Sequence, residues 1–195
     1  CSGLESITLP SNLTSIGDYA FDGCSGLTGD LVIPEGVTSI GDSAFEGCSG
    51  LKSIDLPSSL TSIGSGAFRG CSGLESITLP SNLTSIGDYA FDGCSGLTGD
   101  LVIPEGVTSI GMSAFEGCGG LESITLPSSL TSIGLWAFGD CSGLTDIRIE
   151  ATTPPILGYY AIPSNVTTIE VPSASVDAYK SARGWSSYAD EIVGY

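Results

Sequence analysis

Cysteine recurs along this chain at a nearly constant spacing. The seven cysteines stand at positions 1, 24, 48, 71, 94, 118 and 141, so successive cysteines are 23 or 24 residues apart. Each one opens a unit of similar sequence, which over residues 71–91 reads CSGLESITLPSNLTSIGDYAF. A fixed period of this length is typical of repeat architectures, in which each unit packs only on its neighbours. The period therefore predicts a solenoid and not a globular domain around one closed core.

A second, longer period lies above the first. Residues 71–111 repeat residues 1–41 without a single change. The two 24-residue units share one inserted residue, within 27–34 and 97–104. Identity on this scale indicates either a recent duplication by recombination or a designed consensus sequence.

The apolar residues of one unit predict the core of one coil. They occupy alternate positions of a short strand, then a second pair of positions, and finally an Ala-Phe pair: Leu74, Ile77, Leu79, Leu83, Ile86, Ala90 and Phe91. Pro80 ends the strand by removing a backbone donor, and Gly87 lets the backbone turn. The frequent breakers leave no room for helices of ten or more residues. The unit therefore predicts a β-rich α/β solenoid of parallel strands, whose stacked turns share one continuous core.

Composition excludes several classes of function. Five Lys and Arg face 22 Asp and Glu, which gives a net charge of −17, and the chain has no histidine. A nucleic-acid binder needs clustered cations, and so does a protein that docks on an anionic membrane. Without histidine, the usual catalytic triads and most catalytic zinc sites lose a member. No apolar run approaches the length of a membrane span. We expect no nucleic-acid partner, no membrane insertion and no cofactor.

The unit resembles the BspA-type leucine-rich repeat. The resemblance covers residues 1 to about 150 and rests on the order Leu-x-x-Ile-x-Leu-Pro, Leu-x-x-Ile-Gly, Ala-Phe and Gly-Cys. Residues 169–192 resemble the segment that often closes such proteins in gut and oral anaerobes. The resemblance implies a secreted or cell-surface bacterial protein without enzymatic activity. It further implies an adhesin that binds host extracellular proteins or other cells.

The predicted boundary between solenoid and cap lies near residue 150. Residues 1–150 form six to seven coils, and residues 151–195 form a capping segment that covers the open end of the core. Within the cap, a short helix is expected from Ser175 to Ala182, with Ser175 as its N-cap. An aromatic ligand site is the alternative interpretation of the tail. Because Cys1 starts in mid-pattern, we expect the chain to be part of something longer.

The cysteines predict a structural ladder. Seven thiols cannot all pair internally, and stacked parallel side chains point the same way instead of towards one another. A spacing of 23 residues without a Cys-x-x-Cys motif gives no zinc site. Cys1 invites a lipidated N-terminus, but the repeat phase already explains it. We expect Cys24 to Cys141 to be buried, reduced thiols that pack as small hydrophobic groups.

Function is expected in the outward positions of the first strand. These positions vary between coils while the core does not, and they lie side by side on one sheet face. The candidate partner-binding residues are Asp30, Asp55, Thr78, Asp100, Thr125 and Arg148. A solvated polar face without a ligand is the alternative. A second variable row precedes each Ala-Phe pair and contains Tyr19, Ser43, Gly66, Tyr89, Ser113 and Trp136. Leu135 and Trp136 adjoin the tail and are expected to pack beneath it.

Other activities fit the pattern less well. A glycosidase could use Asp30 with Asp55, or Glu5 with Asp30, but a regular surface offers no pocket that raises one carboxyl pKa. The repeated Thr-Ser pair suggests an ice-binding array, yet successive strand side chains point to opposite faces. Acidic pairs such as Asp18 and Asp22, or Asp30 and Glu35, could hold calcium weakly, without any dedicated loop. The sequence thus predicts a non-catalytic module that binds a protein, possibly a glycan. The alternative is a structural spacer without its own ligand.

Overall fold

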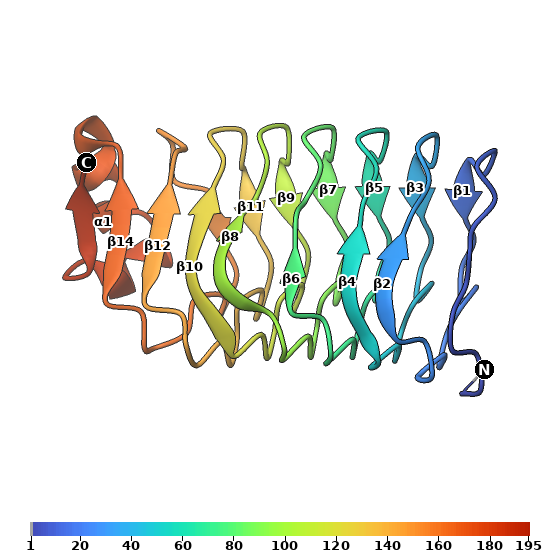
Figure 1. The fold of residues 1–195 in the computed structure, drawn as a ribbon. Coiled ribbons are helices and arrows are strands. Elements are labelled where there is room, and N and C mark those ends of the chain that lie inside the picture. Colours follow the sequence, from blue (N-terminus) through green and yellow to red (C-terminus); the bar gives the residue numbers. More distant parts are fainter. Residues whose placement is uncertain (1) are drawn as a thin grey trace.

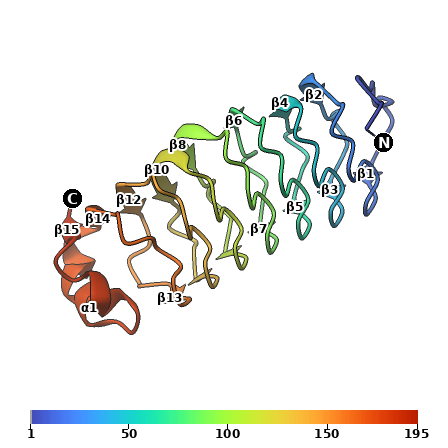
Figure 2. The ribbon, with the colours of Figure 1, turned by 90° about the horizontal axis from the view of Figure 1, so that it is seen from below.

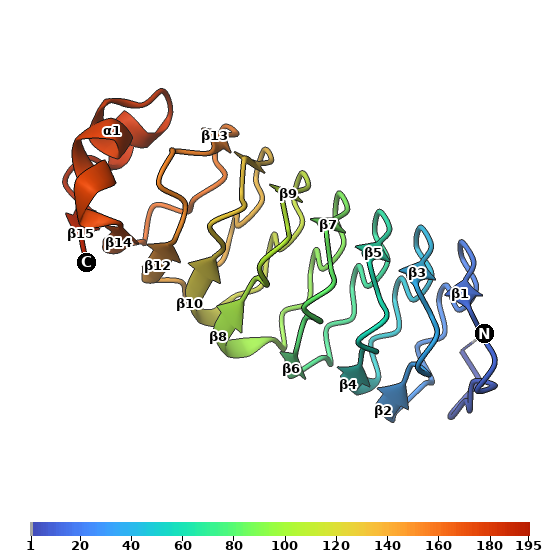
Figure 3. The ribbon, with the colours of Figure 1, turned by 90° about the horizontal axis from the view of Figure 1, so that it is seen from above.

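The computed structural model describes residues 2–195 as an elongated stack of about eight turns (Figure 1). Cys1 lies outside the described residues, and with it the question of lipidation at this position. Long strands follow one edge of the stack and two-residue strands follow the opposite edge (Figures 2 and 3). The two chain termini lie at opposite ends. The predicted solenoid with parallel strands is therefore confirmed.

The short strands form one parallel sheet of seven, which we call the tip sheet. Each strand contains the Ser-Ile pair of one coil, except the last: β1 Ser15–Ile16, β3 Ser39–Ile40, β5 Ser62–Ile63, β7 Ser85–Ile86, β9 Ser109–Ile110, β11 Ser132–Ile133 and β13 Ile156–Leu157. The preceding threonine is exposed, and its Oγ1 donates to the threonine carbonyl of the previous coil, at 3.0 Å for Thr61 to Thr38. A hydroxyl held by the neighbouring coil in this way belongs to the stack, which weakens the ice-binding interpretation.

The long strands form two parallel sheets instead of one. Three make the first sheet: β2 Gly29–Val32, β4 Leu51–Asp55 and β6 Ser76–Ile77. Five make the second: β8 Thr98–Val102, β10 Gly120–Leu126, β12 Asp146–Ile149, β14 Thr168–Val171 and β15 Ile192–Gly194. Within residues 2–195 no strand pairing joins β6 to β8. We call the outward side of both sheets the strand face.

The inserted residue of the 24-residue coils explains this break. It lies between Leu97 and Leu101 and is accommodated at Gly99, whose φ of +74° is in the left-handed region that favours glycine. Strand β8 bends there and pairs only with β10 (Figure 1). Towards the preceding coil, only the N–H and Oγ1 of Thr98 reach the Glu75 carbonyl, at 3.3 and 3.4 Å.

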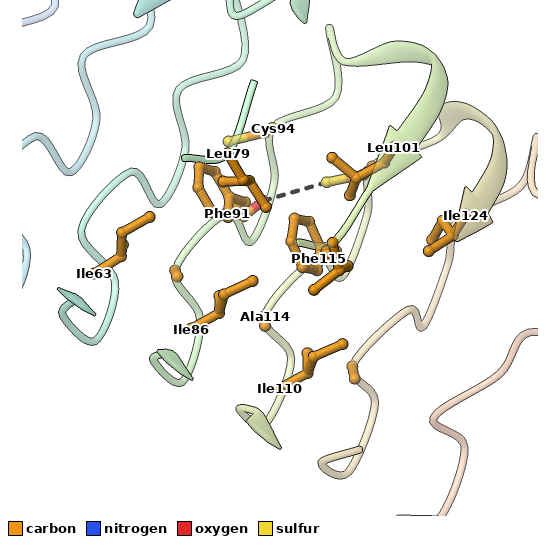
Figure 4. Close-up of a cluster of buried hydrophobic side chains, with 14 of the residues drawn as sticks. Ile63, Leu79, Ile86, Phe91, Cys94, Leu101, Ile110, Ala114, Phe115 and Ile124 are labelled. Atoms are coloured by element: carbon orange, nitrogen blue, oxygen red, sulfur yellow. Dashed lines mark hydrogen bonds between the residues drawn. The ribbon is translucent and has the colours of Figure 1, made fainter. Parts of the chain in front are cut away.

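One apolar core runs the length of the stack. The isoleucines of the tip sheet point inward in a row towards the phenylalanine rings (Figure 4). The six rings stack face to face, with centroids 5.1–5.6 Å apart, along Phe21, Phe45, Phe68, Phe91, Phe115 and Phe138. Every predicted core position of the coil at residues 71–91 is buried except one. Ile77 is only half-buried, because the sheet break leaves the β8 side of β6 uncovered.

Gly87 has a different task from the one the sequence suggested. A Cβ at this position would lie 2.7 Å from the carbonyl carbon of Gly64 in the previous coil, and its φ is not left-handed. Close stacking of adjacent backbones therefore requires glycine here. The left-handed position is two residues later, and non-glycine residues occupy it in most coils, for example Tyr89 with φ +58°.

The last 45 residues continue both edges before they close the end. β13 extends the tip sheet and β14 extends the second sheet. The segment then forms η1 Ser173–Ser175, α1 Val176–Ser181 and η2 Trp185–Tyr188. Tyr179 and Trp185 are fully buried, and their side chains donate to the carbonyls of Ala151 and Pro155. The short helix is present with Ser175 at its N-cap position, but the Ser175 hydroxyl donates to the Thr152 carbonyl and caps nothing.

The predicted thiol ladder is confirmed for the six described cysteines. All are free and buried: Cys24, Cys48, Cys71, Cys94, Cys118 and Cys141. From the second onward, each Sγ donates to the phenylalanine carbonyl of the preceding coil, at 3.1–3.3 Å. Burial in the apolar core raises the pKa of Cys94 to about 12 and that of Cys48 to about 11, from an ordinary value of 9.0.

These shifted pKa values predict that the fold loses stability at alkaline pH. Above pH 9.0 a thiol of the unfolded chain ionises, whereas the folded Cys94 keeps its proton up to about pH 12. The folded state then binds more protons than the unfolded state, so the free energy of unfolding falls as pH rises. The expected slope is about 1.4 kcal/mol per pH unit for each such thiol. Urea denaturation at pH 8 to 10.5 measures it, and Cys94→Ala should have a shallower slope than the parent (about one thiol fewer). Equal slopes would show that this thiol does not titrate differently in the two states.

Candidate partner-binding surface

The outward side chains of the long strands form two rows, as the sequence predicted. One row contains Val32, Asp55, Thr78, Val102, Thr125, Arg148 and Glu170. The other contains Asp30, Ser53, Ser76, Asp100, Ser123, Asp146 and Thr168. The rows run along the strand face, and their members are exposed or half-buried.

The structure divides the six candidate residues in two ways. Asp30 and Asp100 lie in one row, whereas Asp55, Thr78, Thr125 and Arg148 lie in the other. The sheet break separates the first three, on β2, β4 and directly after β6, from the last three, on β8, β10 and β12. The candidates therefore make two groups of three and not one continuous surface.

The first group borders a depression of about 490 Å³, which we call the β4–β6 depression. It is lined by β4, β6, the loops that follow them and Glu35. Half-buried Ile77 supplies an apolar patch to its lining, beside the exposed Asp55 and Thr78. None of the described lining residues is Lys or Arg. This part of the strand face therefore offers an apolar contact beside two carboxylates.

The carboxylates of the first group differ in their partners. Asp30 Oδ1 accepts a hydrogen bond of 2.7 Å from the Ser53 hydroxyl. Glu35 accepts from the N–H and the hydroxyl of Ser58, at 3.2 Å each. Asp55 is exposed beside them. Asp30 and Glu35 are therefore held by neighbouring coils, and Asp55 is the candidate carboxylate placed to meet an incoming group.

The second group borders a smaller depression of about 260 Å³ on β10, β12 and β14. Arg148 forms a 3.0 Å ion pair with Glu170 and lies 3.6 Å from the centre of the Tyr195 ring. Arg148 thus has two partners within the chain, both from the C-terminal segment. Asp100 accepts a 2.6 Å hydrogen bond from Ser123, as Asp30 does from Ser53 in the first copy.

The turns beside the tip sheet contain a group of residues that the sequence did not single out. Ile156, Tyr159 and Tyr160 are exposed there, and Tyr160 stacks on Trp136 with ring centroids 4.8 Å apart. Leu135 is also exposed, so Leu135 and Trp136 do not pack beneath the C-terminal segment as expected. A position-by-position comparison of the two 70-residue copies would have pointed to this edge.

Two further observations concern catalysis and membranes. Residues 2–195 contain no group of three or more His, Cys, Asp or Glu side chains placed to hold a metal ion. The acidic pairs that suggested weak calcium binding gain no further ligand there. Along the same residues, no helix is both long and apolar enough to cross a bilayer.

Comparison with known proteins agrees with this geometry. The chain is similar in structure to a leucine-rich-repeat protein of T. pallidum, with a TM-score of 0.69 and 30% identity over 96% of this chain and 83% of that protein. It is also similar to a leucine-rich cell-surface protein of Faecalibacterium prausnitzii, with a TM-score of 0.62 and 31% identity over 70% of this chain and 48% of that one. No curated protein sequence shows a significant match.

The family follows from the repeat sequence itself. The description of the BspA-type leucine-rich repeat region, in six copies, matches residues 1–99 and 97–182. Leucine-rich repeats generally bind proteins, and the solenoid is generally non-catalytic. The chain belongs to the BspA-type leucine-rich-repeat family.

Proposed function

We propose that this chain is a protein-binding module of a bacterial cell surface, where it acts as an adhesin, and that the β4–β6 depression is its contact surface. The observation that carries the proposal is the half-buried Ile77, an apolar side chain left uncovered on an otherwise polar sheet face. An uncovered apolar side chain between polar neighbours is the usual anatomy of a contact centre. The F. prausnitzii relative, which is described as a cell-surface protein, supports the location.

Charge indicates the kind of protein partner. The net charge of −17 and the lining carboxylates Glu35 and Asp55 favour a partner with a basic rim around an apolar residue. Such complementarity speeds association and excludes acidic partners more than it adds affinity. Host extracellular-matrix proteins with basic patches are the proposed class.

Charge reversal in the depression tests this proposal. The chain is screened for saturable binding to extracellular-matrix proteins and mucins near physiological salt. The variant Asp55→Lys with Thr78→Lys is expected to weaken a hit at least about tenfold, or about 1.4 kcal/mol. The matched control is Asp100→Lys with Thr125→Lys, which changes the net charge equally but lies on the second sheet. It is expected to keep binding within about threefold.

The outcomes separate the depression from the alternatives. Equal losses in both variants would show that overall charge, and not the depression, governs binding. A folded chain that binds nothing on the panel supports the second candidate function, a spacer that holds another domain away from the cell. The absence of paired carboxylates in a closed pocket leaves no support for the glycosidase interpretation.

A further inference from the structure

The two 70-residue copies differ mainly at one edge of the stack. Residues 41–70 and 111–140 occupy equivalent positions and differ at eight of them. Five of the eight lie in the turns beside the tip sheet: Asp42 and Met112, Ser65 and Leu135, Gly66 and Trp136, Arg69 and Gly139, and Gly70 and Asp140. In the second copy, apolar and aromatic residues have replaced polar ones at this edge.

Two of these differences belong together. Trp136 occupies a left-handed position, with φ +57°, where the first copy has Gly66 with φ +62°. A Cβ at Gly139 would clash with Cε3 of the Trp136 ring, so the ring needs a glycine at this position. The first copy has Arg69 there, whose side chain instead pairs with Asp92 at 2.9 Å. The Gly-Arg pair of one copy has become a Trp-Gly pair in the other, which places an indole ring on the surface of the turn.

The next coil extends this ring into a platform. Tyr160 stacks on Trp136 with an interplanar angle of 29°, and it is 67% exposed. Tyr159 is 74% exposed, and its carbonyl accepts the Trp136 N–H at 3.1 Å, which ties the two turns together. Ile156, 77% exposed, stands where the preceding coil has Ser132. We call the group Leu135, Trp136, Ile156, Tyr159 and Tyr160 the tip platform. It lies at the β13 end of the stack, on the edge away from the strand face (Figure 3).

The size and charge of the tip platform decide what can occupy it. A stable protein interface needs about 20–30 residues on each side, many more than these five side chains. A second copy of the chain would bring a further net charge of −17 against the first. The turns at 111–117, 134–140 and 158–162 contain acidic residues but no Lys or Arg, so they offer nothing to an anionic group. The occupant that fits is small, uncharged and flat on one side.

We propose that the tip platform binds an uncharged oligosaccharide. The face of a pyranose ring that carries C–H groups is apolar, and its weakly positive hydrogens are attracted to the negative face of an aromatic ring. Tyr160 offers such a face, and Tyr159 offers hydroxyl hydrogen bonding beside it. The carboxylate of Asp140, which is exposed in the same turn as Trp136, accepts hydrogen bonds from sugar hydroxyls. This surface is distinct from the β4–β6 depression, so the two proposals stand or fall separately.

Calorimetric titration with four neutral sugars tests the proposal. The probes are cellohexaose, laminarihexaose, mannohexaose and chitohexaose, added to the whole chain. At least one is expected to bind with a Kd of about 0.1–1 mM. The variant Trp136→Gly with Gly139→Arg installs the residues of the first copy, which already fit this turn, and is expected to weaken binding at least about tenfold. Asp55→Lys with Thr78→Lys serves as the control and is expected to bind sugar as the parent does.

Two results would overturn the proposal. One is the lack of saturable binding for all four sugars up to about 10 mM. The other is binding that persists within about threefold in the folded variant with Trp136→Gly and Gly139→Arg. A negatively charged sugar, sialyllactose, is expected to bind more weakly than the best neutral probe, and tighter binding of sialyllactose would contradict the charge argument.

Discussion

Replacing Phe91 by alanine is expected to lower the free energy of unfolding by about 3–5 kcal/mol. The Phe91 ring is fully buried and stacks between Phe68 and Phe115, with centroids 5.3 and 5.1 Å away. Its removal leaves a cavity in the middle of the ring stack, and neighbouring coils cannot close it without breaking their own strand pairing. Because each coil is stabilised by its neighbours, the stack should also unfold less cooperatively. Urea denaturation followed by circular dichroism measures both effects.

The duplication supplies a matched control for this substitution. Phe21 stands in the same sequence, since residues 1–41 and 71–111 are identical, and only its place in the stack differs. Phe21 lies in the first coil, is half-buried and stacks on Phe45 at 5.1 Å. Phe21→Ala is therefore expected to cost only about 1–2 kcal/mol. Equal losses for the two variants would mean that local sequence, and not stacking between coils, sets the stability.

The periodic part of this fold was predictable because each coil obeys the same local rules. Apolar residues at alternate strand positions must share one side, and a period of 23 or 24 residues brings equivalent positions into contact. The pattern does not reveal whether adjacent strands pair. One extra residue, accommodated at Gly99, separates β6 from β8 and leaves Ile77 half-buried, although its own coil matches the pattern in full.

The left-handed turn residues lay beyond prediction for another reason. Tyr89 and Trp136 adopt φ values of +58° and +57°, which isolated tyrosine and tryptophan disfavour. The stack enforces this conformation through backbone hydrogen bonds to the next coil, such as the 2.7 Å bond from the Tyr89 N–H to the Met112 carbonyl. Tertiary contacts override local preference here, and local preference is what a sequence reports.

The candidate surface was predictable only in outline. Alternation correctly placed all six candidate residues outward on the strand face. It could not show that Arg148 is already engaged, because Glu170 and Tyr195 reach it only once β14 and β15 have joined the sheet. Whether the remaining positions bind a partner stays a prediction for the charge-reversal experiment.

Ile147→Asp is expected to destabilise the fold by about 4 kcal/mol or more. Ile147 is 1% exposed and pairs with Ile124 on one side and Ile169 on the other, in the middle of the second sheet. A carboxylate there would be buried without a partner, and the chain can avoid that charge only by protonating the carboxyl group or by opening the stack. The loss should therefore be smaller at pH 4 than at pH 7, and urea denaturation at both pH values measures the difference.

Ile77→Asp changes the equivalent residue of the first copy, and its effect should be much smaller, about 2 kcal/mol or less. Ile77 pairs with Ile54 on one side and borders the water-filled β4–β6 depression on the other, so a carboxylate at this position can remain hydrated. Because the carboxyl group then keeps a nearly ordinary pKa, the loss should hardly depend on pH between 5 and 8. The contrast between the two variants isolates the sheet break. If Ile77→Asp unfolds the chain as readily as Ile147→Asp, β6 is covered in solution and the depression proposed for partner binding is closed.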